Sequence, residues 1–273
     1  KEAAQEEVVS FVKSVSSKPV VGVGRFTSPD TMVRQVRKGI LDFVGAARPS
    51  IADPYIPTKI REDRLEDIRE CIGCNVCYAH NSRGAAIRCT QNPTMGEEWR
   101  RDWHPERIPA AHASERVLII GAGPAGLEAS RALGQRGYGV MLAEAGSEPG
   151  GRVSLESRLP GLSEWARVRD WRLQQLTKLP GVELYLESPM SAADALGCET
   201  DHILVATGAE WRRDGVSIHR ATAIDLAADT PVFSPDDIMA GSLPDGPVAL
   251  YDDDTYYMSA TIAMALRQAG REV

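Results

Sequence analysis

With 273 residues, 43% of them hydrophobic and 25% charged, the chain has the composition of an ordinary globular protein with room for about two domains. Its formal net charge is −7 at pH 7 and no basic stripe stands out, which argues against nucleic acid as a partner. No apolar run reaches the roughly 18 residues of a membrane-spanning helix, and KEAAQEEVVS at the N-terminus lacks a signal-peptide core. We therefore expect no membrane partner and a cytoplasmic location, where clustered thiols more often bind metal than form disulfides.

The N-terminal part of the chain predicts alternating helices and strands. An amphipathic helix is expected over residues 6–15, and a second helix over 28–39 begins with Ser28 as its N-cap. Strands are expected over 18–26 and 41–49. One face of the first helix carries four apolar residues: Val8, Phe11, Val12 and Val15.

Each of these two strands ends in a small residue followed by arginine. The turns are Gly24-Arg25 and Ala47-Arg48. Strand, helix and strand with such turns resemble the last units of a (β/α)8 barrel, where the final two loops commonly bind a phosphate. Two parallel strands cannot bury their own faces, so we expect the chain to begin inside a barrel.

Four of the five cysteines follow a spacing typical of a metal cluster. The sequence CIGCNVC holds Cys71, Cys74 and Cys77, and Cys89 follows after eleven further residues. Three thiolates on a tight loop and one returning from a distance suit a cubane iron-sulfur cluster, and Gly73 lets the loop turn its amides toward the sulfurs. A zinc ion or unrelated buried thiols are the alternatives. Cys198 stands alone and is interpreted as a structural or surface thiol.

A second strong signal begins at residue 116. A short apolar strand over 116–120 runs into GAGPAG at 121–126, a helix is expected over 127–137, and a second strand over 138–144. Because strand, glycine loop, helix and second strand occur in this order, the pattern predicts a Rossmann-like adenine-nucleotide site.

Individual residues of this segment have distinct expected roles. Gly121, Gly123 and Gly126 allow the tight turn, the close approach to a pyrophosphate and the contact of helix with strand. The helix N-terminus faces the phosphates, and Glu144 at the end of the second strand is placed to bind the ribose hydroxyl groups.

Two later stretches fit the same nucleotide fold. EPGGR at 148–152 adds a glycine pair, and HILVATGA at 202–209 predicts a buried strand that ends in Ala206-Thr207-Gly208. Small residues at that end let the backbone lie against a nucleotide. Taken alone, this turn is equally compatible with a plain strand-to-loop connection.

The segment after residue 247 repeats the nucleotide motif without its glycines. Adding 133 to each position aligns Leu133 with Leu266 and Gly137 with Gly270. The three loop glycines then correspond to Asp254, Tyr256 and Ser259. A carboxylate repels pyrophosphate and a tyrosine fills the space the backbone needs, so we expect a degenerate dinucleotide fold that does not bind NADPH.

The order of five motifs closely resembles that of the iron-sulfur flavoprotein amine dehydrogenases. The motifs are GVGRF, GAARPSIADP, CIGCNVC, CTQNPTMGEEWRRDWHPE and GAGPAGLEA. These are the trimethylamine, dimethylamine and histamine dehydrogenases, which are related to 2,4-dienoyl-CoA reductase. The resemblance implies FMN in a barrel, a [4Fe-4S] cluster, bound ADP rather than FAD, a small amine as substrate, and an electron-transferring flavoprotein as acceptor. It also implies a homodimer in the full-length form.

Site residues follow from the resemblance by position. Those for the FMN phosphate would be Gly24, Arg25, Ala47 and Arg48, and those for the cluster Cys71, Cys74, Cys77 and Cys89. Those for ADP would be Gly121, Gly123, Ala125, Gly126, Glu144, Gly151, Arg152, Thr207 and Gly208. Family members are more than twice as long, and we expect the substrate pocket to lie upstream of Lys1, so no catalytic residue is named.

The expected fold is α/β in four parts. These are the end of the barrel over 1–58, the cluster segment over 59–112, the nucleotide domain over 113–215 and the start of the degenerate domain over 216–273. A reductase that uses NADPH and a stand-alone electron carrier remain the alternative functions. The lost glycines count against the first, and the two barrel strands with their phosphate turns count against the second.

Overall fold

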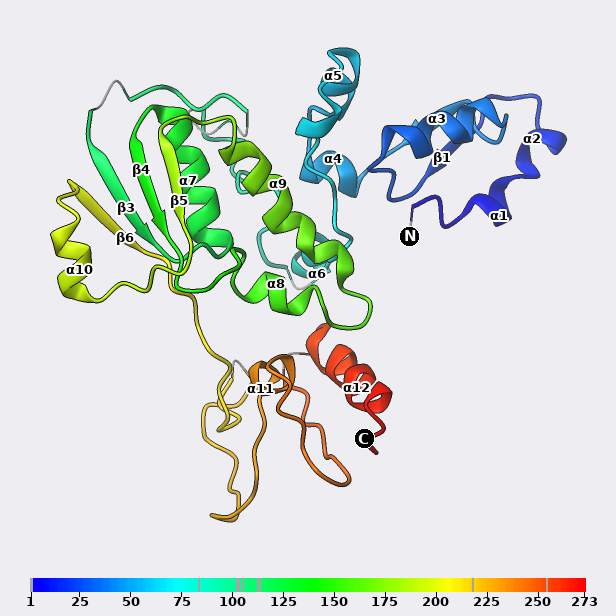
Figure 1. Cartoon of the computed structure of the whole chain (residues 1–273). Coiled ribbons are helices and arrows are strands. Elements are labelled where there is room, and N and C mark those ends of the chain that lie inside the picture. Colours follow the sequence, from blue (N-terminus) through cyan, green and yellow to red (C-terminus); the bar gives the residue numbers. More distant parts are fainter. Residues whose placement is uncertain are drawn as a thin grey trace. The chain divides into compact units, whose positions relative to one another are not determined.

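The computed structural model describes residues 2–82, 84–101, 104, 106–111, 114–217, 219–253 and 255–273. The chain divides into two compact units. The first comprises Lys1–Glu115, Ser130–Gly139 and Asp170–Val182, and the second comprises Arg116–Ala129, Val140–Arg169 and Glu183–Val273. Helices accompany parallel strand pairs in both units, which confirms the predicted α/β class (Figure 1).

The first unit begins with two short helices and a pair of parallel strands. α1 (Glu6–Val9) and α2 (Val12–Val15) precede β1 (Val21–Val23), and α3 (Pro29–Arg37) leads to β2 (Phe43–Gly45). β1 and β2 pair in parallel, with Val21 opposite Phe43 and Val23 opposite Gly45. The predicted strand–helix–strand order is confirmed, although both strands are shorter than expected.

The single helix expected over residues 6–15 is wrong. α1 ends at its C-cap Ser10, and α2 starts after its N-cap Phe11. A helix draws most of its stability from the packing of its apolar face. Here Val8, Phe11 and Val15 are 66%, 60% and 75% exposed, so a continuous helix lacks the packing that the sequence pattern presupposes.

The strand pair buries one face and exposes the other. A Cβ at Gly22 would lie 2.4 Å from Cδ2 of Leu41, so glycine is required for Leu41 to pack on β1. On the other face, Val21, Val23 and Phe43 remain about 60% exposed. This agrees with the expectation that two parallel strands cannot bury both of their faces.

Beyond β2, a buried ion pair organises the chain. The elements here are α4 (Arg48–Ala52), α5 (Ile56–Arg61) and η1 (Leu65–Asp67). Nζ of Lys59 donates to Oδ2 of Asp53 at 2.7 Å and to the carbonyl oxygen of Asp67 at 2.8 Å. It also donates to Oε1 of Glu106 at 3.0 Å. Because Asp53 is fully buried and Lys59 nearly so, the pair replaces hydration with fixed hydrogen bonds.

A four-stranded sheet forms the centre of the predicted nucleotide fold. Its strands and first helix are β3 (Arg116–Ile120), α7 (Pro124–Arg136), β4 (Gly139–Ala143), β5 (Val182–Tyr185) and β6 (His202–Val205). The strand order is β5-β4-β3-β6, with β3 and β6 parallel, and Figure 1 shows it. The strands of the motif start and end within one residue of the positions predicted at 116–120 and 138–144.

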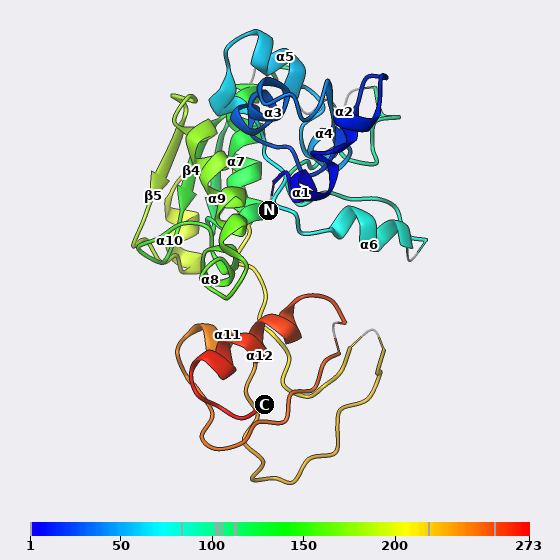
Figure 2. The ribbon, with the colours of Figure 1, turned by 90° about the vertical axis from the view of Figure 1, so that its right-hand side faces the viewer.

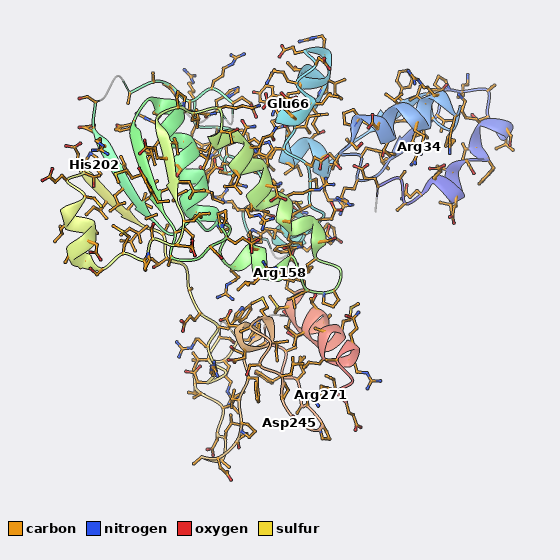
Figure 3. All side chains as sticks on the ribbon, in the orientation of Figure 1. Arg34, Glu66, Arg158, His202, Asp245 and Arg271 are labelled. Atoms are coloured by element: carbon orange, nitrogen blue, oxygen red, sulfur yellow. The ribbon has the colours of Figure 1, made fainter. Side chains whose placement is uncertain are left out.

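The expectation of a buried strand over 202–209 is wrong in two respects. β6 ends at Val205, and it occupies the edge of the sheet, with His202 (labelled in Figure 3) at its start. Ile203 and Val205 are 40% and 69% exposed. An apolar run does not tell a central strand from an edge strand, since the difference lies in which strands flank it.

Between and beyond these strands, the regular elements are helices joined by irregular segments. The remaining elements are α8 (Arg152–Glu156), η2 (Ser163–Trp165), α9 (Ala166–Leu176), α10 (Ala192–Gly197), α11 (Pro235–Met239) and α12 (Met258–Gln268). Figure 2 shows α11 and α12 side by side. Across the described residues, no helix has both the length and the apolar character that crossing a lipid bilayer requires.

α7 and α12, which the predicted repeat aligns, end in the same pattern of hydrogen bonds. Gly137 N donates to Gly134 O at 3.0 Å, and Gly270 N, 133 positions later, donates to Arg267 O at 3.0 Å. Tyr138 N and Arg271 N then donate to the carbonyl oxygens of Leu133 and Leu266 at 3.1 and 2.9 Å. Both helices therefore end in the same Schellman turn, with a glycine of positive φ at the same place.

The repeat lacks the strand that precedes the helix. Across 219–253 and 255–273, the structure contains helices but no strand. Val248 N donates a backbone hydrogen bond to Glu272 O at 2.8 Å. These two residues correspond, with the offset of 133, to Glu115 and Gly139, and Gly139 N likewise donates to Glu115 O. Asp254, at the first glycine position, lies outside the described residues.

The buried ion pair predicts a large effect of one substitution. Lys59→Met is expected to lower the free energy of unfolding by about 3–5 kcal/mol, because Asp53 keeps a buried charge without its cation. Lys13→Met removes the Lys13–Asp42 pair, whose side chains are both 34% exposed, and should lower the stability far less, because solvent screens this pair. Urea denaturation of both variants measures the difference; equal losses would contradict the argument.

Candidate functional site

The four predicted ligand cysteines line one cavity. Cys71 and Cys74 come from the loop before α6 (Val76–Ser82), Cys77 from the first turn of that helix, and Cys89 from the loop that follows it. The structure thus brings together all four thiols that the spacing selects, and none of the four is part of a disulfide. Their neighbours in the cavity wall are Arg48, Ile51, Ile72, Asn75, Thr90 and Gln91.

Backbone amides point at two of the sulfurs. Gly73, with φ of +72°, turns its amide toward Cys71, as expected from the sequence. The amides of Gln91 and Asn92 bond to Cys89, the first with N 3.4 Å from Sγ. Such donors stabilise thiolate charge, and they are the usual surroundings of an iron-sulfur cluster.

Burial makes two of the cavity thiols weaker acids than a free cysteine. Burial raises the pKa of the Cys71 and Cys89 thiols, and the neighbouring thiol of Cys74 raises both further. Buried thiols with raised pKa values ionise readily only when a metal compensates their charge. Within the described residues, no group of three His, Cys, Asp or Glu side chains is arranged to hold a metal ion.

A second cavity lies beside the cysteine loop. Gly24, Arg25, Arg48 and Gly73 line it together with Ala4 and Gln5, so both arginines predicted for the FMN phosphate meet there. Ala47 caps α4 and presents Arg48 at its first position. Two guanidinium groups in one cavity suit a phosphate group.

The two arginines also contact the cysteine loop, which the sequence did not predict. Nη1 of Arg25 donates to the carbonyl oxygen of Cys71 at 2.8 Å, and Arg48 donates to the side-chain oxygen of Asn75. Arg48 lines both cavities. The cavity lined by the two arginines and the cysteine cavity therefore share a wall.

The glycines of the predicted nucleotide loop make close contacts. A Cβ at Gly126 would lie 1.9 Å from the carbonyl oxygen of Gly121, and one at Gly121 would lie 2.5 Å from that of Ala206. Gly123 has no heavy atom within 4 Å of its Cβ position, so space remains at this point. At Gly121 and Gly126, therefore, the packing of the loop leaves no room for a side chain. At Gly123 the space is open, and there a pyrophosphate is expected to approach.

The glycine pair at 150–151 lies against this loop. Gly150 N donates to Ala122 O at 2.7 Å, and a Cβ at Gly151 would lie 3.2 Å from Cα of Gly123. The structure therefore brings together the two glycine-containing stretches that the sequence places in one site.

Glu144 binds the loop itself. Its carboxylate accepts hydrogen bonds from the amides of Ala122 at 2.8 Å and Gly146 at 2.9 Å. Each carboxylate oxygen has a second lone pair, so a ribose hydroxyl group can still be accepted. The ribose contact stays a prediction, and the structural role was missed.

The remaining nucleotide candidates lie around these loops. Ala125 is exposed at the start of α7, and Thr207 and Gly208 are exposed just after β6. Arg152 is engaged elsewhere, since it pairs with Asp236 of α11 at 2.5 Å and donates to the carbonyl oxygen of Ala209. A direct contact between Arg152 and a nucleotide therefore stays a prediction.

Comparison with protein families defines the class. Residues 1–67 match the NADH:flavin oxidoreductase / NADH oxidase family, and residues 115–227 match the pyridine nucleotide-disulphide oxidoreductases. The first corresponds to a flavin-binding barrel and the second to a Rossmann-like nucleotide fold, in the order that the sequence predicts.

Several of the individual proteins that the chain resembles are enzymes that act on amines. The chain is 42% identical over 281 aligned positions to dimethylamine dehydrogenase from Hyphomicrobium sp. (strain x), covering 99% of this chain and 38% of that protein. It is 54% identical, with a TM-score of 0.94, to 6-hydroxypseudooxynicotine amine oxidase from Pseudomonas geniculata N1, covering 100% and 41% of the two chains. It is also 53% identical, with a TM-score of 0.92, to histamine dehydrogenase from Rhizobium sp. 4-9; the match covers 99% of this chain and 40% of that chain.

The chain belongs to the flavoprotein amine dehydrogenase family, which confirms the predicted resemblance. It spans about two fifths of the length of the relatives it matches.

Proposed function

We propose that the chain is the electron-transfer part of an iron-sulfur flavoprotein amine dehydrogenase that oxidises a small amine. FMN would take electrons from the amine, and a [4Fe-4S] cluster would pass them singly to an electron-transferring flavoprotein. The names of the relatives support an amine of the dimethylamine or histamine type. The free cysteines support a reducing compartment such as the cytoplasm, where cluster ligands stay available.

One observation carries this proposal: the cavity lined by four cysteines shares Arg48 with the cavity of the two predicted phosphate arginines. Cys71, Cys74, Cys77 and Cys89 would hold the cluster, and Arg25 and Arg48 would hold the FMN phosphate. A flavin and a cluster at these places would be neighbours, as electron transfer between them requires.

We further propose ADP as the ligand of the glycine loop. The carboxylate of Glu144 would repel a ribose 2′-phosphate, which disfavours NADPH. In the repeated segment, Tyr257 occupies the start of α12, with its ring centroid 4.6 Å from that of Trp165 and its hydroxyl group donating to Glu156 at 2.9 Å. An NADPH-dependent reductase would need an open helix start here to bind the dinucleotide. Because Tyr257 closes this start, the contact supports an amine dehydrogenase instead.

The cluster can be tested by composition. Protein prepared without oxygen is expected to contain about four irons and four sulfides per chain, with visible absorbance that dithionite bleaches. Cys74→Ser should lose this absorbance, whereas Cys198→Ser should keep it, because Cys198 packs with Met190 in a separate cluster of side chains. Zinc in place of iron and sulfide would overturn the assignment.

The glycine loop predicts two different outcomes for the same substitution. Gly126→Ala is expected to lower stability by about 1–3 kcal/mol or more, since its Cβ meets the carbonyl oxygen of Gly121 at 1.9 Å. Gly123→Ala should leave stability nearly unchanged but weaken ADP binding at least tenfold. Calorimetric titration with ADP, together with thermal unfolding, separates the two; undiminished ADP binding by Gly123→Ala would contradict the site.

The electron path can be tested in a fusion of the barrel of histamine dehydrogenase from Rhizobium sp. 4-9 to this chain. Histamine should then reduce both the flavin and an external acceptor. With Cys74→Ser, rapid mixing should still show flavin reduction by histamine, but reduction of the acceptor should be lost. The Cys198→Ser fusion serves as the control, and unchanged acceptor reduction by the Cys74 variant would exclude the proposed path.

A further inference from the structure

The side chain of Thr90 lies directly against one of the ligand cysteines. Its Oγ1 is 2.7 Å from Sγ of Cys74, which is 16 residues away in the sequence. In the thiol form either group can be the donor, but a thiolate has no proton to give. Once Cys74 is ionised, Thr90 is the donor of this hydrogen bond.

We propose that Thr90 donates a hydrogen bond to the Cys74 thiolate and thereby raises the reduction potential of the iron-sulfur cluster. This inference rests on the proposed cluster. Reduction by one electron makes the cluster and its sulfur ligands more negative. A donor held at a ligand sulfur stabilises the reduced form more than the oxidised form, and hydrogen bonds to the sulfurs are among the factors that set these potentials.

The loop that carries Thr90 is held in place by buried polar contacts. Gln91 is 1% exposed, and its side-chain amide donates to the carbonyl oxygen of Glu70 at 3.1 Å. Arg172, from α9 and 3% exposed, donates to Oε1 and to the carbonyl oxygen of Gln91 at 3.1 and 3.2 Å. Nδ2 of Asn92 donates to the carbonyl oxygen of Ile51 at 3.0 Å. Thr90 is therefore presented to Cys74 by a backbone that is fixed on its C-terminal side.

Thr90 differs in kind from the donors on the sulfurs of Cys71 and Cys89. Cys71 and Cys89 receive hydrogen bonds from the backbone amides of Gly73, Gln91 and Asn92, which persist whatever side chains these positions carry. The bond to Cys74 comes from a side chain, so one substitution removes it. The identity of residue 90 is thus a means of adjusting the potential without moving a ligand.

The test is a redox titration of the cluster in the full chain, followed by its visible absorbance and by electron paramagnetic resonance. Thr90→Val removes the hydroxyl group at nearly constant shape, and Thr90→Ser keeps it. Thr94→Val is the matched control, because its hydroxyl group lies in the same loop and donates to Oδ1 of Asn92 at 2.8 Å. The pair Thr90→Ala and Thr90→Ser, which differ by a single hydroxyl group, replaces the valine variant should that variant fail to fold.

Thr90→Val is expected to shift the one-electron equilibrium about tenfold toward the oxidised cluster, which corresponds to a potential lower by about 59 mV. Thr90→Ser should stay near the parent value, as should Thr94→Val. Equal potentials in hydroxyl-bearing and hydroxyl-free variants that retain iron and sulfide would overturn this inference alone. A parent chain that assembles no cluster would overturn it together with the proposed function.

Discussion

The buried carboxylate of Asp53 is the constraint on which the cysteine loop depends. It is fully buried, it pairs with Lys59, and its Oδ2 also accepts the backbone amide of Arg69 at 2.8 Å. Two residues after Arg69 comes Cys71, so the path of the chain into the cysteine loop is set by a charge that cannot leave its partners without a large desolvation penalty. A hydrophobic contact would tolerate a shift of this backbone, whereas a buried ion pair with directed hydrogen bonds holds it in one position.

The same part of the chain is held from further directions, each by an arginine. Arg69 lies with its guanidinium carbon 4.3 Å from the ring centroid of Trp171, whose indole nitrogen donates to the carbonyl oxygen of Asp67 at 3.2 Å. Arg172, the next residue of α9, fixes Gln91 beside Cys89, and Arg25 fixes the carbonyl oxygen of Cys71. Arginine suits these places because its planar group donates in several directions and remains charged when buried. Besides fixing the loop geometrically, the guanidinium group of Arg25 acts to lower the pKa of the Cys71 thiol, although burial raises this pKa by more.

How much of this follows from the sequence depends on how local the cause is. The cysteine spacing and the glycine loop were predicted because the turn, the thiols and the clash at Gly126 all arise within a few neighbouring residues. Arg172 was missed because it is 81 residues from the Gln91 that it binds, and nothing in ARVRDWRLQQL distinguishes it from a surface arginine. Thr90 had a weak signal, since a hydroxyl residue directly follows Cys89, but its partner across the loop was not readable. The burial of β6 was misjudged for a similar reason: the neighbours of a strand are a property of the sheet order.

α7 and α12, the two helices that an offset of 133 residues aligns, agree at their ends and differ at their starts. α7 and α12 end in the same Schellman turn, because any helix that reverses its chain there must satisfy its last carbonyl groups and needs a residue of positive φ. At their starts the two helices differ completely. Gly123 leaves open space before α7, whereas before α12 the rings of Tyr256 and Tyr257 lie edge to face with centroids 5.1 Å apart, and Tyr257 reaches the buried Glu156. Such a contact stabilises the helix by packing, and it places an aromatic side chain at the N-cap of α12. The two helices therefore share the turn that ends them, which the folding of either one requires, and differ at their starts, where α7 has open space and α12 is closed by side-chain packing.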